Sequence, residues 1–392
     1  MNCNTLSQIF CLLCFFIGWS AAAQSVKVSV ENTLDFDRVE VAAIEKASLS
    51  GFLARHDKKH LRIKREGTEA FLPIQWTDYD GDGNPDALLF QAFVPAKSTT
   101  NYVIVSDSIK KISRTEIKAY CKFNPDRDHD VAWENDKVAF RAYGQKKQKQ
   151  SKKAALDVGS SGICPLLKKV NYAVLDDWYA KDKKSAGYSH TDQGEGYDGY
   201  SMGNGRGIGG TGLWLNDTLQ VPKRFSECRI VDNGPLRVTF ELVYEAWSTH
   251  LVEETKRISM DLGSNFSRFD VYFTSNTKAP NYAIGISLHQ NTGQAKADRE
   301  KGLFRYWETI DGVPIGTGLI VEPKLVADAL THTDPDPDQS HLLVVTKPRD
   351  RLSYYAGFAW QKSGQANTAA DWDGLMEKQL LVLQNPLRVT TY

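Results

Sequence analysis

The chain has 392 residues, and its 48 Lys and Arg residues are balanced by 48 Asp and Glu residues. A formal net charge of zero argues against nucleic acid as the main partner. The length allows a large hydrophobic core, which we expect to divide into two packed units, and an aromatic content of 11% suits both β-sheets and stacking against sugars.

The first 24 residues are typical of a secretory signal peptide. The apolar run from Ile9 to Trp19 is too short to span a bilayer comfortably, and Ala21-Ala22-Ala23 provides small residues for cleavage. We therefore expect cleavage near Gln24 and a mature protein that is periplasmic or secreted, without membrane insertion. The cysteines that remain allow at most one internal disulfide; they are Cys121, Cys164 and Cys228.

Alternating apolar and polar residues dominate the rest of the chain, and a period of two is typical of β-strands. Turn dipeptides such as Asn233-Gly234 and Asp311-Gly312 separate the runs. The fold class is all-β, with a small N-terminal β-sandwich domain over residues 25–115 and a larger β-sandwich over residues 116–392. The segments that we expect as strands are 26–30, 60–64, 87–93, 102–105, 236–244, 255–260, 269–273, 342–346 and 354–358, and the one short helix that we expect covers residues 371–380.

An aspartate-rich segment between two expected strands has acids at positions 1, 3, 5 and 9 and a glycine at position 6. This pattern matches a short calcium-binding loop, because Ca²⁺ prefers several oxygen ligands and glycine allows a sharp turn. The alternative is a hairpin turn without metal, since Asp and Gly also favour turns. The candidate ligands of a structural calcium ion are Asp78, Asp80, Asp82 and Asp86. We expect no organic cofactor.

The segment from Trp133 to Gly144 places an aromatic ring beside hydrogen-bonding groups, as sugar-binding subsites do. We predict that Glu134 and Asn135 contact a substrate and that Arg141 binds a carboxylate or sulfate through paired hydrogen bonds. The alternative is an aromatic strand that carries a structural Arg–Glu pair.

The segment from Tyr188 to Trp214 contains nine glycines. Ordering so many glycines is entropically unfavourable, which indicates that the backbone has to pass close to another group. Loops of this kind often carry function. His190 can act as an acid or a base near neutral pH, and Arg206 between two glycines has an uncrowded backbone from which to reach an anion. The other polar candidates in this loop are Tyr188, Asp192, Glu195, Tyr197, Asp198 and Tyr200. Outside the loop, His289 ends an expected strand and is either a further substrate ligand or a half-buried strand residue.

Several of these segments resemble a secreted Bacteroidetes family described as a domain of unknown function (4861), whose members lie in polysaccharide-utilisation clusters. The resemblance extends from Glu31 to the C-terminus, and a departure is Cys164-Pro165, where relatives are expected to carry an acidic residue. The segments are WENDKVAFRAYG, HTDQGEGYDGYSMGNGRGIGGTGLW, GPLRVTFELVYEAW and ETKRISMDLGSNFSRFDVYFT.

This resemblance implies a galactose-mutarotase-like β-sandwich, or supersandwich, as the larger unit. The family includes a dehydratase of ulvan oligosaccharides, so the implied substrate is an anionic oligosaccharide. The implied reaction removes water from a non-reducing-end uronic acid next to sulfated rhamnose and leaves a 4,5-unsaturated uronate.

Such an elimination needs three groups. A cation must neutralise the uronate carboxylate so that negative charge can develop at C5, and we assign this role to Arg206, with Arg141 as the second candidate. A base must remove the C5 proton and an acid must protonate the leaving C4 hydroxyl. His190, Tyr197 and Tyr200 are the candidates for the base and the acid.

Three other functions use the same residues. A polysaccharide lyase needs the same groups but expels a glycosidic oxygen, and a mutarotase or epimerase moves protons without net elimination. A non-catalytic periplasmic sugar-binding protein would use the calcium loop and the aromatic residues as its binding face, but it would leave the acid–base cluster without a role.

Overall fold

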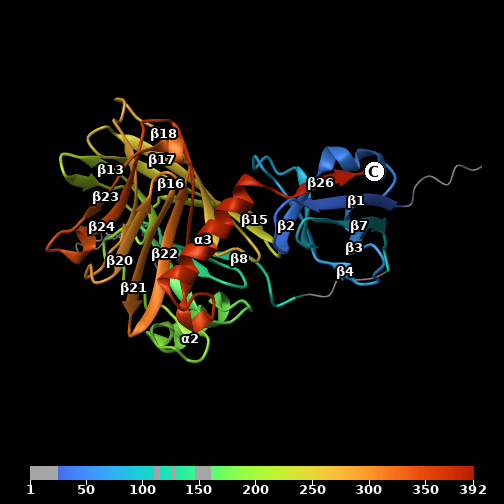
Figure 1. Ribbon diagram of the computed structural model, residues 1–392, viewed down its shortest axis with the longest axis horizontal. Coiled ribbons are helices and arrows are strands. Elements are labelled where there is room, and N and C mark those ends of the chain that lie inside the picture. Colours follow the sequence, from blue (N-terminus) through green and yellow to red (C-terminus); the bar gives the residue numbers. More distant parts are fainter. Residues whose placement is uncertain (1–24, 110–114, 126–128, 146–159) are drawn as a thin grey trace, which may run out of the picture.

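The computed structural model describes residues 25–109, 115–125, 129–145 and 160–392. The expected signal peptide lies outside the described residues. Two β-sandwich units lie side by side, the larger at the left and the smaller at the right of Figure 1. The all-β prediction is confirmed, and each segment expected as a strand coincides with or overlaps an observed strand. Within the described residues, no helix has both the length and the apolar character needed to cross a membrane.

The smaller unit is a sandwich of two sheets whose apolar side chains alternate along the strands. Val28, Val30 and Ile104, for example, are fully buried in the core between the sheets. One sheet has the order β26 (Arg388–Thr391), β1 (Ser25–Asn32), β7 (Ser98–Ser106), β3 (Leu61–Arg65) and β4 (Phe71–Leu72), and the other has the order β2 (Arg38–Glu45), β6 (Ala87–Val94) and β5 (Ile74–Thr77). Between β2 and β3 the chain forms η1 (Lys46–Leu49), α1 (Ser50–Leu53) and η2 (Lys58–His60).

The last strand of the chain lies in this smaller unit. β26 pairs antiparallel with β1, with Val30 opposite Val389. Our division near residue 115 assigned all later residues to the larger unit, because alternation along a strand does not specify which sheet edge the strand will join. That division remains a prediction, and the observed pairing adds residues 388–391 to the sheets of the smaller unit.

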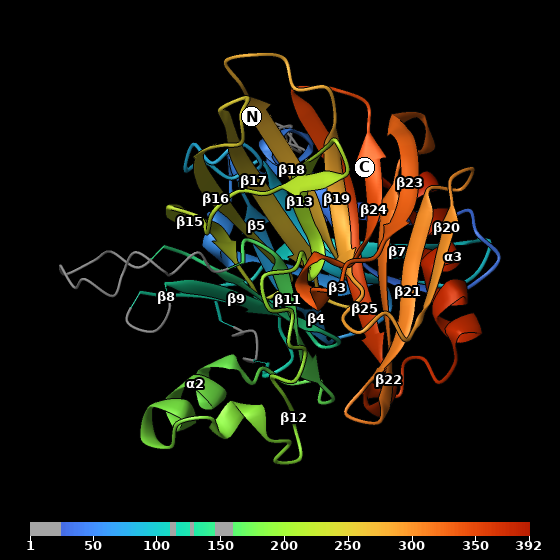
Figure 2. The same cartoon turned by 90° about the vertical axis from the view of Figure 1, so that its left-hand side faces the viewer.

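The larger unit packs one wide sheet against two narrower ones, and the inner faces of all three share one hydrophobic core. The wide sheet has the order β15 (Glu227–Asn233), β16 (Arg237–Trp247), β17 (Val252–Asp261), β18 (Phe266–Thr274), β25 (Arg351–Trp360), β22 (Val313–Val321), β21 (Leu303–Ile310) and β20 (Gln294–Asp298). Facing it are β14 (Thr218–Gln220), β13 (Ile208–Leu215), β19 (Tyr282–Ser287), β24 (His341–Thr346) and β23 (Val326–His332), and then β12 (Gly196–Tyr197), β11 (Ile163–Lys168), β10 (Ala139–Tyr143), β9 (Asp130–Glu134) and β8 (Tyr120–Asn124). Figure 2 shows β13, β19 and β24 in front of the wide sheet. The short helical turns described in this unit are η4 (Tyr188–His190), η5 (Pro323–Leu325), η6 (Pro337–Gln339) and η7 (Gln361–Ser363).

Two helices cover outer faces of the larger unit. α2 (Leu175–Lys184) packs Leu175, Trp178 and Tyr179 against the sheet that contains β9 and β11. We did not predict α2, because only these three of its ten residues are buried and the rest are mostly charged. The predicted helix 371–380 lies within α3 (Ala369–Gln384), which begins with a capping box between Thr368 and Asp371.

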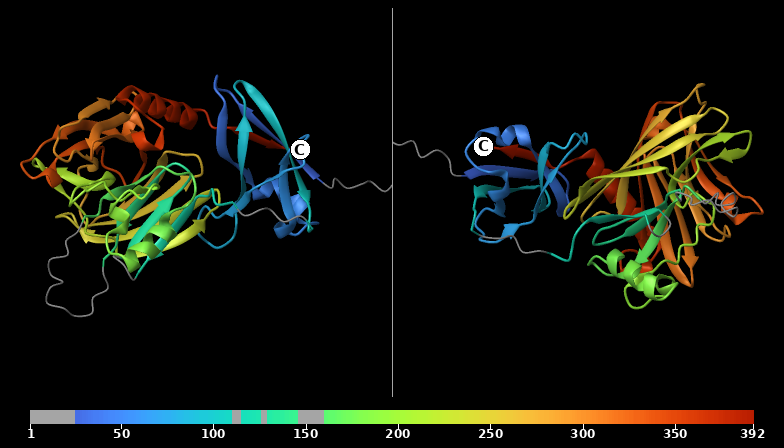
Figure 3. Two further views of the ribbon diagram at one scale, coloured as in Figure 1. Left: turned by 90° about the horizontal axis from the view of Figure 1, so that it is seen from below. Right: turned by 180° about the vertical axis from the view of Figure 1, so that it is seen from behind.

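α3 packs on the outer face of the wide sheet and then leads into β26, so it bridges the two units (Figure 3). Trp372 is the buried anchor of this helix. Its ring stacks on Phe266 with 5.4 Å between the centroids, and its indole nitrogen donates to the Thr317 carbonyl at 3.2 Å. Gly316 and Gly318 leave room for it, since a Cβ on Gly316 would approach the ring to 2.5 Å.

We expect Trp372→Ala to reduce the free energy of unfolding by about 3–5 kcal/mol, because it opens a cavity between α3 and the wide sheet. Leu381→Ala on the same helix is the matched control, since Leu381 is 42% exposed, and it should change stability by about 0.5 kcal/mol or less. Chemical denaturation measures both values. Equal losses in the two variants would contradict the assignment of Trp372 as the anchor.

Candidate functional site

The glycine-rich segment from Tyr188 to Trp214 includes β12 and most of β13, and it passes close to β11 and β19. A Cβ on Gly196 would lie 1.9 Å from the Leu167 carbonyl oxygen, and a Cβ on Gly207 would lie 1.9 Å from the Ile163 carbonyl oxygen. The backbone N–H of Gly207 donates to Ser287 Oγ at 2.8 Å, and the backbone N–H of Ser287 donates to the Gly207 carbonyl at 2.8 Å. These glycines therefore let the backbone pack against β11 and β19, which fixes the course of the segment between them.

Tyr200 lies in this segment and meets His289, which follows the end of β19. The two rings are edge to face, with 4.6 Å between their centroids and an interplanar angle of 73°. Both carboxylate oxygens of Glu308, on β21, lie 2.9 Å from His289 Nδ1. The His289 backbone has a φ of 48°, a conformation that is uncommon for residues other than glycine and recurs at functional sites.

One polar atom of each ring in this pair has no protein partner. Within the described residues, the Tyr200 hydroxyl and His289 Nε2 are buried and make no hydrogen bond. Burial and then the charge of Glu308 raise the pKa of Tyr200 well above 10, so its hydroxyl stays protonated. Because the Glu308 carboxylate accepts a hydrogen bond from Nδ1–H, Nε2 of a neutral imidazole is left as an acceptor. The three side chains thus present a base and an acid next to each other.

A buried cation lies near this pair. Arg141 Nη2 binds Asp198 Oδ2 at 2.7 Å, and both side chains are less than a tenth exposed. Burial alone would lower the pKa of Arg141, but Asp198 outweighs it and the pKa is raised. Cys164 is opposite Arg141 in the β10–β11 register, and its thiol donates to the Tyr200 carbonyl at 3.3 Å. Cys164 thus connects Arg141, its neighbour across the strands, with the backbone of Tyr200. The predicted substrate ligands Arg141 and Asp198 therefore lie close to the Tyr200 segment.

The two remaining proton-transfer candidates have other contacts. His190, in η4 (Tyr188–His190), has a side chain that is 60% exposed, and its Nδ1 lies 3.1 Å from the Asp198 carbonyl. The Tyr197 hydroxyl donates to Asp311 Oδ2 at 2.7 Å, at the turn between β21 and β22. Burial, that hydrogen bond and the charge of Asp311 raise the pKa of Tyr197. The structure thus brings Tyr200, rather than Tyr197, next to a histidine, and that histidine is itself held by a carboxylate.

Three other predicted substrate ligands, Tyr188, Asp192 and Glu195, contact residues outside the loop. Asp192 accepts from Lys169 Nζ at 2.9 Å. Burial opposes ionisation of Asp192, but this hydrogen bond and backbone amides lower its pKa to about 2. The contacts of the three residues are Lys181 with the Tyr188 ring, Lys169 and Lys362 with Asp192, and Tyr172 and Trp178 with Glu195.

Glu134 and Asn135 hold the fold together, which corrects their prediction as substrate ligands. Both are fully buried. The Glu134 carboxylate binds Lys168 Nζ at 2.7 Å and accepts from the backbone N–H groups of Val174 and Leu175 at the start of α2. Asn135 accepts from two backbone amides and donates to two backbone carbonyls, so its hydrogen-bonding capacity is used within a turn.

Arg206 also has an internal position, although we predicted that it clamps the substrate carboxylate. It is 1% exposed, and its guanidinium donates to Ser161 Oγ at 2.9 Å and to the carbonyls of Asn204 and Thr211. Burial lowers its pKa to about 10. Its contacts hold the glycine-rich segment to the β11 side, so we no longer assign it to a substrate.

The aspartate-rich loop gathers part of its predicted metal cluster. Carboxylate oxygens of Asp78, Asp80 and Asp86 lie within 4.8 Å of one another, and hard oxygen ligands at this spacing fit Ca²⁺. Asp82 is outside that group, and its carboxylate accepts from the backbone and side-chain amides of Asn84.

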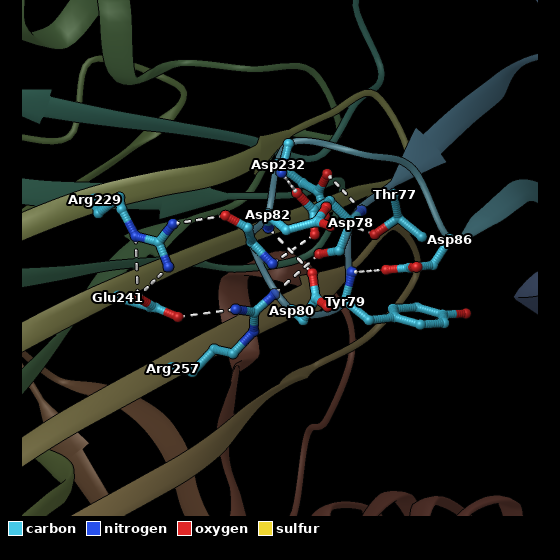
Figure 4. A network of polar contacts seen from close by, with 12 residues as sticks. Thr77, Asp78, Tyr79, Asp80, Asp82, Asp86, Arg229, Asp232, Glu241 and Arg257 are labelled. Atoms are coloured by element: carbon cyan, nitrogen blue, oxygen red, sulfur yellow. Dashed lines mark hydrogen bonds and ion pairs between the residues drawn. The ribbon is translucent and has the colours of Figure 1, made fainter.

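This loop also docks the smaller unit onto the larger one (Figure 4). Arg257 donates to the Asp78 carbonyl at 3.0 Å, and Arg229 donates to the Gly81 carbonyl at 3.1 Å. Glu241 binds both guanidiniums. Burial disfavours the charged form of Asp78, but amide hydrogen bonds from its own loop outweigh this and lower its pKa. The loop is therefore anchored by hydrogen bonds from two arginines to its backbone carbonyls, whether or not it holds a metal.

Glu308 is the residue of the site that we did not predict from the sequence. It is 5% exposed and lies on the same inward face of β21 as the buried residues Phe304 and Tyr306. An acid in register with inward-facing aromatic residues is unfavourable unless it has a partner. An acid at an inward-facing position of an apolar strand is therefore the feature of the sequence that could have indicated Glu308 as a site residue.

Comparisons with known proteins give the family but no activity. The model of the family described as "Domain of unknown function (DUF4861)" matches residues 30–389. A protein of Formosa agariphila named "Uncharacterized protein P7" is 33% identical over 372 residues, which cover 93% of this chain and 92% of that protein.

Two solved structures from Enterococcus faecalis are also similar. One is an alpha-mannosidase, with 9% identity, a TM-score of 0.48 and coverage of 95% of this chain and 46% of that chain. The other is a protein in glycosyl hydrolase family 38, with 10% identity, a TM-score of 0.49 and coverage of 95% of this chain and 48% of that chain. This chain therefore spans about half the length of each of them.

Stability should fall at acid pH because of His341. Its Nε2 accepts from the Arg206 backbone N–H at 3.2 Å, and its Nδ1 donates to the Gln339 carbonyl at 2.8 Å. Burial and then the Arg206 charge lower its pKa from 6.5 to about 3. The stability contributed by neutral His341 is complete above pH 6.5 and is lost as pH falls toward 3, at about 1.4 kcal/mol per pH unit. His341→Asn should remove this slope in denaturation measured from pH 7 to pH 4, and an unchanged slope would contradict it.

Calcium binding by the aspartate-rich loop remains a prediction. A chelator should lower the melting temperature of the wild type by a few degrees, because a ligand bound only to the folded state stabilises it. Asp80→Ala should abolish this response, whereas Asp82→Ala should keep it, since Asp82 is outside the cluster. If a chelator has no effect on the wild type, the segment is a turn without a bound metal.

Proposed function

This chain belongs to the DUF4861 family, and from that premise we propose that it is a carbohydrate-active enzyme. We propose in particular an oligosaccharide dehydratase that removes water from a non-reducing-end uronic acid and leaves a 4,5-unsaturated uronate. One observation supports the chemistry: His289 is held by Glu308 at 2.9 Å and packs against the ring of Tyr200, and both His289 Nε2 and the Tyr200 hydroxyl lack a hydrogen-bond partner. The carbohydrate substrate and its ulvan-type linkage rest on the sequence resemblance.

In the proposed reaction, His289 Nε2 takes the C5 proton. The C5–H electron pair forms the C4=C5 double bond, and the C4–O bond breaks. Tyr200 donates its proton to the departing hydroxyl, so water leaves. Proton transfer from the imidazolium to the tyrosinate then restores the starting state. Glu308 acts as a positioning residue, since it fixes the tautomer of His289 and stabilises the imidazolium.

Arg141 is the cation best placed to stabilise charge that spreads onto the uronate carboxylate. It is charged, buried and adjacent to the Tyr200 segment through Cys164. A fixed charge in a poorly solvated site stabilises a developing anion more strongly than it would in water. Asp198 keeps the guanidinium oriented in the absence of substrate.

The site lies close to the molecular surface. The His289 side chain is 20% exposed, whereas that of Glu308 is 4% exposed. A substrate oxygen or C–H group would provide the partner that these two atoms lack. A sequence with the expected export signal would meet such substrates in the periplasm or outside the cell.

The wild type should convert a saturated, uronate-ended oligosaccharide into a product that absorbs in the ultraviolet band of unsaturated uronates and is lighter by one water. His289→Ala and Tyr200→Phe should each lower kcat by about 10²–10⁴, because each removes one proton-transfer step. Tyr354→Phe is the matched control. It also removes a buried tyrosine hydroxyl, but one that is bonded to the Gly209 carbonyl at 2.6 Å, so kcat should be kept.

Each other outcome has a distinct meaning. Cleavage into shorter sugars with an unsaturated end would identify a polysaccharide lyase that uses the same residues. Full turnover by both His289→Ala and Tyr200→Phe would overturn the proposed site. Binding of the oligosaccharide without any chemical change would favour a non-catalytic sugar-binding protein.

A further inference from the structure

A groove of about 1100 Å³ separates the two units and has no part in the proposed reaction. Its floor is the outer face of the wide sheet at β17, β18 and β25, and its walls are β2 of the smaller unit and α3. Phe304, Tyr306 and Glu308 lie on the inner face of that sheet, whereas Arg305, next to them on β21, binds Asp373 of α3 outside it. The groove and the His289 site are therefore on opposite faces of one sheet.

The floor of the groove displays two guanidiniums beside two tyrosine rings. In the β18–β25 register, Arg268 is opposite Tyr355 and Tyr272 is opposite Arg351. Arg268 binds Asp270 through two nitrogens at 2.8 and 3.1 Å, and Arg351 Nη2 binds the same carboxylate at 3.2 Å. Arg351 also lies 5.1 Å from the centre of the Tyr272 ring. A single acid thus orients two arginines whose side chains are 45% and 56% exposed.

Charge is distributed unevenly around the groove. Two lysines, Lys137 and Lys378, line it at the α3 end together with the two arginines of the floor. The acids of the floor are Asp270 and Asp261, and Asp261 is paired with Arg237. The other arginines that line the groove, Arg38, Arg237 and Arg257, are each paired with a carboxylate. On the side of the smaller unit the lining acids are Asp37, Glu40, Glu45 and Asp78.

This arrangement suits a ligand that carries both anions and hydroxyl groups. Exposed guanidiniums bind carboxylates through paired hydrogen bonds, tyrosine rings stack on sugar faces, and the opposite acids accept hydrogen bonds from hydroxyls.

An acidic peptide fits this groove less well. Extended peptides usually add to the edge of a sheet, but β17, β18 and β25 are interior strands whose backbone groups are paired on both sides.

We propose that this groove binds an extended, uronic-acid-containing oligosaccharide at a site separate from the acid–base pair, with Arg268 and Arg351 as the carboxylate ligands and Tyr272 and Tyr355 as the stacking rings. Asp270 is the positioning residue, because it holds both arginines on the floor. A volume of about 1100 Å³ exceeds what a single small molecule needs, which favours a chain of several sugars. This binding site does not depend on the proposed reaction.

The test is isothermal titration calorimetry of the full chain with oligogalacturonate, in a His289→Ala background so that turnover cannot interfere. Arg268→Ala combined with Arg351→Ala should weaken binding by about tenfold or more, since two charge-assisted contacts are lost. Methyl-esterified oligogalacturonate should bind about tenfold more weakly to the parent. Arg299→Ala is the matched control, because Arg299 is an exposed, ion-paired arginine outside the groove. The affinity of this variant for oligogalacturonate should stay within about twofold of that of the parent.

Lys378→Glu on α3 gives a second, independent variant in case the double substitution fails to fold. It should also weaken binding, and added salt should weaken binding of the parent. Three results would overturn the proposal: no measurable binding of oligogalacturonate, equal affinity in the parent and the groove variants, or binding of poly-L-glutamate within about twofold of oligogalacturonate. The last result would identify a surface for acidic peptides.

Discussion

The candidate site depends on the close approach of one glycine-rich backbone segment to two strands. Gly196 lies against β11. Gly207 both donates a hydrogen bond to Ser287 and accepts one from it, at the end of β19. No residue with a side chain fits at either glycine, because a Cβ would overlap a carbonyl oxygen. Because both ends of this stretch are pinned, Tyr200 between them is brought to His289, which lies two residues beyond Ser287. The same constraint leaves His190, before Gly196, at the surface.

Buried charges support this arrangement in two places. The Glu134–Lys168 pair is fully buried and fixes the start of α2, which in turn contacts the early part of the glycine-rich segment. Arg141 and Asp198 form a second internal pair beside Tyr200. Removing one partner of a buried pair is costly, so these residues are expected to tolerate little substitution whatever reaction the site performs.

The wide sheet of the larger unit separates two chemical environments. Its inner face carries Glu308 among aromatic and aliphatic residues, where a poorly solvated histidine–tyrosine pair can exchange protons. The outer face carries exposed arginines and tyrosines and receives α3 and the aspartate-rich loop. Alternation along β18, β21 and β25 makes this possible, because successive side chains point to opposite faces. In the two proposals, the residues that bind the oligosaccharide and those that perform the chemistry therefore lie on opposite sides of this sheet.

The sequence by itself determined the local structure. Alternation predicted the strands, Asp311-Gly312 predicted the turn between β21 and β22, and the family resemblance was readable without coordinates. The sequence also predicts an export signal and a site centred on the glycine-rich segment, and it included Tyr200 and His289 among the candidates. These features depend on neighbours along the chain, which a sequence displays directly.

Only the tertiary structure decided which polar residues meet. Glu134 and Arg206 looked like substrate ligands in sequence, but Lys168, the start of α2 and Ser161 satisfy them inside the fold. Tyr200, His289 and Glu308 come from three separate elements, and no local pattern specifies their pairing. β26 likewise returns across the whole chain to pair with β1. Partners of this kind are set by the packing of sheets over long sequence distances, so the residue types alone could not distinguish a buried structural charge from a group that is left free to react.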